Sequence, residues 1–118
     1  MPTIRVMVID DHPIVRQGVR SLLSNYADLE IVGEAENGSA ALQHAPELLP
    51  NVILLDIRMP GETGIDLIRR LQQTAPDAKI LMLTSFDDRE YVTGALRAGA
   101  HGYVLKSISE FVFRRGSQ

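Results

Sequence analysis

The chain of 118 residues contains no cysteine, and its histidines are few. The missing cysteine excludes disulfides, thiolate metal sites and cysteine nucleophiles. His12, His44 and His101 are scattered along the sequence, which argues against a metal centre built from histidines. A metal site in this chain should therefore be made of oxygen ligands.

Large clusters of positive charge and long hydrophobic runs are also missing. The formal net charge is −3 and the largest basic cluster is Arg114-Arg115, so the electrostatic footprint of a nucleic-acid-binding protein is not present. The longest apolar runs have the length of strands, too short to span a membrane. The first of them begins at Ile4, which leaves no room for a signal peptide. We expect a cytoplasmic protein.

What remains is the composition of an ordinary globular domain. Hydrophobic residues make up 45% of the chain and charged residues 23%. The length fits one hydrophobic core, and no repeat, low-complexity tract or linker divides the sequence. We therefore expect residues 1–118 to form a single domain.

Short apolar runs alternate with segments of helical periodicity. Strands are predicted over residues 4–10, 29–35, 51–56, 79–84 and 101–105. Helices are predicted from near Pro13 and over about 39–49, 64–74 and 87–98. The residues expected on the inward helix faces are Ile14, Val15, Val19, Leu22, Leu23, Ala41, Leu42, Ala45, Leu49, Ile65, Ile68, Leu71, Val92, Ala95 and Leu96. This alternation predicts an α/β fold with a doubly wound parallel sheet and right-handed crossovers.

Several residues should set the helix ends. Pro13 suits the first turn of the first helix, and Pro46 should kink or shorten the second. Asp87 or Asp88 can cap the fourth helix, which Gly99 should close.

Carboxylates close two of the predicted strands. Asp10 and Asp11 follow the apolar run that starts at Ile4, and Asp56 ends the run that starts at Asn51. Because the carboxyl ends of parallel strands meet at one edge of a sheet, these three acids should share a small volume. Bare anions there would repel one another strongly, so a divalent cation is implied. Oxygen-rich surroundings favour Mg²⁺.

The final stretch fits this pattern less well. A fifth helix could begin at Ser109, but the chain reaches Gly116 after only a turn or two. The consecutive apolar residues Phe111-Val112-Phe113 match no clean amphipathic helix. We expect about residues 108–118 to form an atypical or truncated C-terminal helix or tail.

Taken together, these features resemble the receiver domain of two-component response regulators over Ile4 to about Ser107. The matching residues are Asp10-Asp11, Asp56 with the Met59-Pro60-Gly61 loop, Thr84, Ala98-Gly99-Ala100, Tyr103 and Lys106. The motifs that begin at Asp10 and at Leu83 are similar to the NarL/FixJ-type subgroup. Members of that subgroup usually carry a C-terminal helix-turn-helix DNA-binding domain, which these residues do not include. The resemblance implies a flavodoxin-like five-stranded parallel sheet of order 2-1-3-4-5.

The resemblance also implies a chemistry for the site. Asp56 would accept a phosphoryl group, and the Thr84 hydroxyl and the Lys106 ammonium group would contact it. The ligands of Mg²⁺, for which Mn²⁺ could substitute, would be Asp10, Asp11, Asp56 and the backbone carbonyl of Arg58. Such a domain is not a turnover enzyme but catalyses its own phosphorylation and dephosphorylation.

Regulation and partners follow from the same resemblance. Thr84 and Tyr103 would form a conformational switch, whereas Arg58 and Phe86 would tune the rate of dephosphorylation. The partners would be a sensor histidine kinase and, on phosphorylation, a second copy of the chain. DNA would be contacted only through a helix-turn-helix domain, and no membrane would be involved.

Four of these residues also have a simpler interpretation. Asp56 could only start a turn, and Asp11 could only cap the helix that begins near Pro13. Thr84 and Tyr103 are residue types that strands favour.

Two other functions stay open. One is a receiver-shaped interaction module that is not phosphorylated, although the chain retains every acid and Lys106. The other is a Mg²⁺-dependent phosphohydrolase with an aspartyl intermediate. Such enzymes place a second acid two residues after the nucleophile of the first strand, whereas here adjacent acids precede His12-Pro13.

Overall fold

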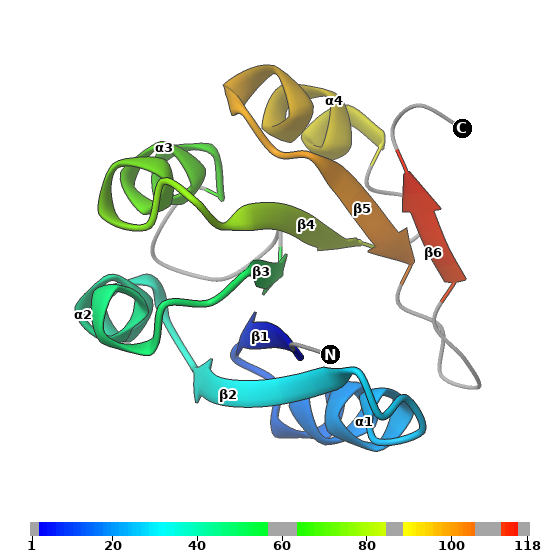
Figure 1. Cartoon of the computed structure of the whole chain (residues 1–118). Helices are drawn as coiled ribbons and strands as arrows, with labels where there is room; N and C mark the ends of the chain where they lie inside the picture. The colour runs from blue at the N-terminus through cyan, green and yellow to red at the C-terminus, as the bar shows by residue number, and fades with distance from the viewer. Residues whose placement is uncertain (1–2, 57–63, 85–88, 106–111, 116–118) are drawn as a thin grey trace.

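The computed structural model describes residues 3–56, 64–84, 89–105 and 112–115. In these ranges six strands form one sheet, with helices on both of its faces (Figure 1). The described helices are all too short or too polar to cross a membrane.

The strands are β1 (Ile4–Ile9), β2 (Leu29–Ala35), β3 (Val52–Asp56), β4 (Lys79–Thr84), β5 (Gly102–Leu105) and β6 (Val112–Arg115). The helices are α1 (Pro13–Leu23), α2 (Gly38–Leu48), α3 (Gly64–Thr74) and α4 (Arg89–Ala98). The five predicted strands and four predicted helices are all present. The residues expected to cap α4, Asp87 and Asp88, lie outside the described residues.

The strand order is β2-β1-β3-β4-β5-β6. The first five strands are parallel, which confirms the predicted flavodoxin-like order 2-1-3-4-5. Their carboxyl ends therefore lie at the same edge of the sheet.

The C-terminal segment is predicted to form a truncated helix, but its described residues form a strand. Val112–Arg115 form β6, which pairs antiparallel with β5, with Val112 opposite Leu105 and Arg115 opposite Gly102. In sequence, Phe111-Val112-Phe113 joins aromatic and β-branched residues, which favour strands over helices. The unpaired edge of β5 offers such a segment a row of hydrogen-bonding groups. The rest of the predicted helix lies outside the described residues.

Two apolar clusters cover the two faces of the sheet because side chains alternate along each strand. The cluster under α2, α3 and α4 includes Met7 and Ile9 of β1, whereas the cluster under α1 includes Val6 and Val8 of the same strand. Figure 1 shows α1 on the opposite face from α2 and α3. Both faces of β1 are thus buried, as its nearly continuous apolar sequence requires.

Helix α1 begins at Pro13 as predicted, because proline tolerates the first helical position. Val19 and Leu23 are buried against the sheet, but Ile14 is 83% exposed, contrary to its predicted inward position. Ile14 lies in the first turn, whereas the buried residues of α1 belong to its later turns.

Helix α2 begins with a side-chain cap. The Asn37 side-chain oxygen accepts a hydrogen bond of 2.8 Å from the Ala40 N–H. The helix continues past Pro46 and ends at Leu48. Leu49 follows with φ of +49° and is 72% exposed, so its predicted burial is wrong. The left-handed residue that ends α2 turns the chain away from the core.

At the amino-terminal edge of the sheet, His101 bridges two strands. The ring Nδ1 of His101 accepts a hydrogen bond of 3.1 Å from the Ile80 N–H, and the backbone N–H of His101 donates to the Ile80 carbonyl at 2.8 Å. Partial burial, together with the charge of Lys79, lowers the pKa of His101 below its ordinary value. His101 therefore stabilises the start of β5 as a neutral hydrogen-bond acceptor.

Candidate functional site

The strand register brings the predicted acids together. Ile9 of β1 pairs with Leu55 of β3, so the next residues, Asp10 and Asp56, lie side by side at the carboxyl edge of the sheet. Asp11 and His12 follow in the short connection to α1. Carboxylates that lie far apart in the sequence therefore converge, as the sequence predicted.

Two of these carboxylates are removed from solvent. The side chains of Asp10 and Asp56 are 0% and 1% exposed, whereas that of Asp11 is 27% exposed. The backbone also fixes Asp10, since its N–H donates to the Ala35 carbonyl of β2 at 3.0 Å. Buried acids are costly unless compensated, so this pocket is built to hold a positive group.

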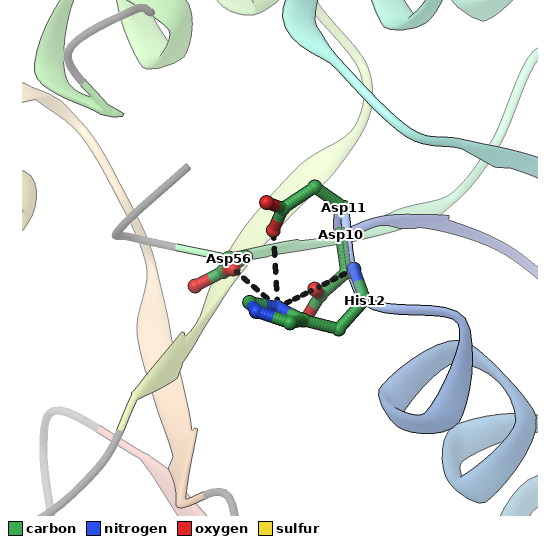
Figure 2. Close-up of side chains that lie close together, drawn as sticks. All are labelled: Asp10, Asp11, His12 and Asp56. Carbon is green, nitrogen blue, oxygen red and sulfur yellow. Dashed lines mark hydrogen bonds and ion pairs between the residues drawn. The ribbon is translucent and has the colours of Figure 1, made fainter. Parts of the chain in front are cut away.

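The imidazole ring of His12 lies against all three acids. Its Nδ1 lies 3.0 Å from Asp10 Oδ1, 3.0 Å from Asp11 Oδ1 and 3.9 Å from Asp56 Oδ2. Its backbone N–H also donates to Asp10 Oδ1 at 2.9 Å. Figure 2 shows the imidazole ring among the three carboxylates. From the sequence, His12 is expected to be structural or solvated and to follow the acids only by chance. The structure differs, because the imidazole ring lies against all three carboxylates.

The donor set fits a divalent metal ion. One ligand atom from each of Asp10, Asp11, His12 and Asp56 lies within 4.8 Å of the others. Carboxylate oxygens are the ligands that Mg²⁺ and Mn²⁺ take in proteins, and a cation would offset the repulsion between them. The three acids named from the sequence as metal ligands are thus in one place. The Arg58 carbonyl lies outside the described residues.

Thr84 ends β4, next to the strand that carries the predicted phosphoacceptor. Leu83 pairs with Asp56, which places Thr84 one residue further along β4, and Thr84 is only 1% exposed. On β5, Tyr103 pairs with Met82 and packs, half-buried, against the cluster under α2, α3 and α4. Thr84 and Tyr103 thus lie on adjacent strands within two residues in register. Lys106 and Phe86, the other predicted site residues, lie outside the described part of the chain.

A further group near the pocket was not predicted from the sequence. Arg16 of α1 donates from Nη1 to the Asp10 carbonyl at 2.6 Å, and its Nε lies 3.2 Å from Glu34 Oε1. Arg20, one turn later on α1, also forms an ion pair with Glu34. Arg16 thereby joins α1, the end of β1 and the end of β2. In the sequence, the contact of Arg16 with the pocket is indicated only by its position near the start of the helix that follows the acidic pair.

Comparison with known proteins places this arrangement in a family. A sequence model of the response regulator receiver domain matches residues 6–114. The chain is 39% identical over 108 residues to the transcriptional regulatory protein MctR of Rhizobium johnstonii, an alignment covering 92% of this chain and 50% of MctR. It is 42% identical over 107 residues to the response regulator protein VraR of Staphylococcus aureus, covering 91% and 51% of the two chains. The chain spans about half the length of the curated relatives it matches.

Solved structures agree with this assignment. The signal receiver domain of the response regulator NarL from Mycobacterium tuberculosis has a TM-score of 0.81 and 37% identity, covering 93% of this chain and 90% of that one. The isolated receiver domain of RcsB from Salmonella enterica serovar Typhimurium, in the presence of the phosphomimetic BeF₃⁻, has a TM-score of 0.81 and 33% identity. That match covers 88% of this chain and 78% of the RcsB domain. The chain therefore belongs to the response regulator receiver domain family.

Proposed function

We propose that this chain is a signalling receiver in which Asp56 accepts a phosphoryl group from a partner histidine kinase in a Mg²⁺-dependent reaction. The observation that carries the proposal is the convergence of Asp10, Asp11 and Asp56 at the carboxyl edge, with ligand atoms within 4.8 Å of one another. A core without function would not bury two carboxylates side by side.

Asp56 is the nucleophile of the proposed reaction. A carboxylate oxygen of Asp56 forms a bond to phosphorus while the P–N bond of the kinase phosphohistidine breaks, and the leaving imidazole takes the electron pair. Mg²⁺ when bound would offset the repulsion between the carboxylate and the phosphoryl oxygens. Burial of Asp56 at the end of a central strand holds its carboxylate in a fixed place for this attack.

The neighbouring residues have distinct proposed roles. Asp10 and Asp11 would hold the metal together with Asp56, while Arg16 fixes the carbonyl of Asp10. The Thr84 hydroxyl donates to an oxygen of the new acyl phosphate. From the family resemblance, Lys106 would pair with the phosphoryl charge and the Arg58 carbonyl would be a further metal ligand. Arg58 and Phe86 would set the rate of hydrolysis.

Phosphorylation would be read out through β4 and β5. Movement of Thr84 toward the phosphoryl group changes the space beside Tyr103, whose half-buried ring packs on the adjacent strand. A pre-existing equilibrium between two arrangements of this region would shift accordingly. We include in the proposal a cytoplasmic location, pairing with a second copy on phosphorylation, and control of transcription through a separate DNA-binding domain. RcsB, a relative by structure, has been solved bound to a promoter.

Small phosphodonors test the chemistry without the kinase. Incubation with acetyl phosphate and Mg²⁺ should add one phosphoryl mass to the intact chain, and EDTA should prevent the addition. Asp56→Asn should abolish it, whereas Asp77→Asn, at an exposed acid before the amino-terminal end of β4, should leave it unchanged. Equal labelling of Asp56→Asn and wild type would reject Asp56 as the acceptor.

A further inference from the structure

His12 occupies the N-cap position of α1 but does not act as a cap. Its backbone is extended, with φ of −100° and ψ of 112°, and its side chain makes no hydrogen bond to the first turn of the helix. Residues that favour this position, such as serine or aspartate, accept a bond from the helix N–H groups. The side chain of His12 is directed instead toward the acidic pocket (Figure 2).

The ring nitrogen Nδ1 lies at the centre of this pocket. It is 3.0 Å from an oxygen of Asp10, 3.0 Å from an oxygen of Asp11 and 3.9 Å from an oxygen of Asp56. The ring is nonetheless 60% exposed, so Nδ1 can exchange one partner for another without unfolding the core. His12 therefore adds a nitrogen ligand to a group of metal-ligand atoms that would otherwise all be carboxylate oxygens.

We propose that His12 determines the metal specificity of this pocket by giving it an Nδ1 ligand for Zn²⁺ and similar borderline divalent ions. Imidazole suits such ions, and four-coordinate zinc sites combine histidine nitrogen with carboxylate oxygen. Mg²⁺ prefers oxygen ligands and keeps several waters, so it gains little from His12. The inference uses the carboxylates of the proposed function but does not require that Asp56 be phosphorylated.

A second histidine provides the natural control. His44 of α2 lines a cleft of about 300 Å³ together with Glu34 and Glu36. Among the described residues, however, the histidine and acidic side chains whose ligand atoms converge are those of the pocket around His12. Zn²⁺ should accordingly bind at His12 and not at His44.

Nitrogen NMR of a chain labelled with ¹⁵N-histidine tests this directly. Addition of one equivalent of Zn²⁺ should shift the Nδ1 resonance of a single histidine by the amount expected for direct coordination of a ring nitrogen. Mg²⁺, held by the neighbouring carboxylates, should cause a clearly smaller shift. The shifted resonance should be missing in His12→Gln and present in His44→Gln. By calorimetry, His12→Gln should weaken Zn²⁺ binding by at least about tenfold, the usual scale for disturbing a metal site. The ratio of Zn²⁺ to Mg²⁺ affinity should fall by a similar factor.

Three results would overturn the inference: no shift of any histidine nitrogen in the wild-type chain, a shift that disappears in His44→Gln, or equal Zn²⁺ affinity in His12→Gln and wild type. The NMR measurement on the wild-type chain does not depend on the folding of a variant. A failure of the proposed function would differ, because Asp56 would then resist acetyl phosphate while His12 still bound Zn²⁺.

Discussion

Removing one carboxylate from the pocket should stabilise the metal-free domain. Asp10 and Asp56 are buried, and their ligand oxygens lie within 4.8 Å of one another. Asp56→Asn keeps the size of the side chain but removes one of the mutually repelling charges. The variant should therefore have a higher free energy of unfolding than the wild type when no divalent ion is present.

The size of the effect follows from the geometry. Two unit charges 4.8 Å apart repel by about 3.5 kcal/mol at an effective dielectric constant of 20. Hydrogen bonds to the carboxylates, such as that from the His12 backbone N–H to Asp10 Oδ1, offset part of this repulsion, so we expect a gain of about 1–3 kcal/mol. Asp10→Asn should act in the same direction. The double variant should gain less than the sum of the two, because both remove the same repulsion.

Urea denaturation with and without Mg²⁺ measures these changes. At an ion concentration 100 times its dissociation constant, the wild type should gain about 2.7 kcal/mol, as linkage requires. Asp56→Asn should gain much less, since it has lost a metal ligand. The difference between the two free energies of unfolding should thus shrink or change sign when Mg²⁺ is added.

Asp77→Asn controls for the general effect of removing a negative charge. Asp77 is exposed and lies just before the amino-terminal end of β4, whereas the pocket lies at the carboxyl ends of the strands. The free energy of unfolding of this variant should change little in either condition. If Asp56→Asn were no more stable than the wild type without metal, electrostatic repulsion would not dominate the pocket. The crowding of the acids would then give no reason to expect a cation in the pocket.

Three further predictions concern residues outside the pocket. Burial holds the pKa of His101 below 6.5, so the unfolded chain takes up the proton first and stability should fall as the pH drops below about 6.5. His101→Asn, whose side-chain oxygen can still accept from the Ile80 N–H, should make the urea midpoint less dependent on pH. Asn37→Ala should cost about 1 kcal/mol of unfolding free energy through loss of a helix cap, whereas Asn37→Asp should retain it. Gly99→Ala should cost at least about 1 kcal/mol in urea unfolding, because φ is +122° and a Cβ atom would collide with Gln72.

The acids of the site could be predicted because they follow from topology. Once alternation implies a parallel sheet, a carboxylate at the end of one apolar run must lie at the same edge as a carboxylate at the end of another. The position of Asp10, Asp11 and Asp56 could therefore be predicted without knowledge of side-chain conformation. The order of the five parallel strands came from the family resemblance, and the structure bears it out.

The contacts of His12 and Arg16 could not be predicted in the same way. Each depends on a side-chain rotamer and on the angle at which α1 leaves β1, and neither is fixed by periodicity. Ile14 shows the same limit, since helical spacing gives its direction around the helix but not the distance of the first turn from the sheet. Local pattern determines which residues share a face, and tertiary geometry determines which of them are buried.

The C-terminal segment shows a competition that the sequence pattern alone did not decide. A helix after β5 would bury an amphipathic face, but the residues around Val112 have no helical stripe to bury. Pairing with β5 satisfies backbone groups on an otherwise open edge, and it needs only strand-forming side chains. Because β1 and β3, which carry the acids, are separated from β6 by β4 and β5, either outcome leaves the convergence of Asp10 and Asp56 unchanged. The wrong prediction of a helix after β5 therefore does not affect the prediction of the acidic site.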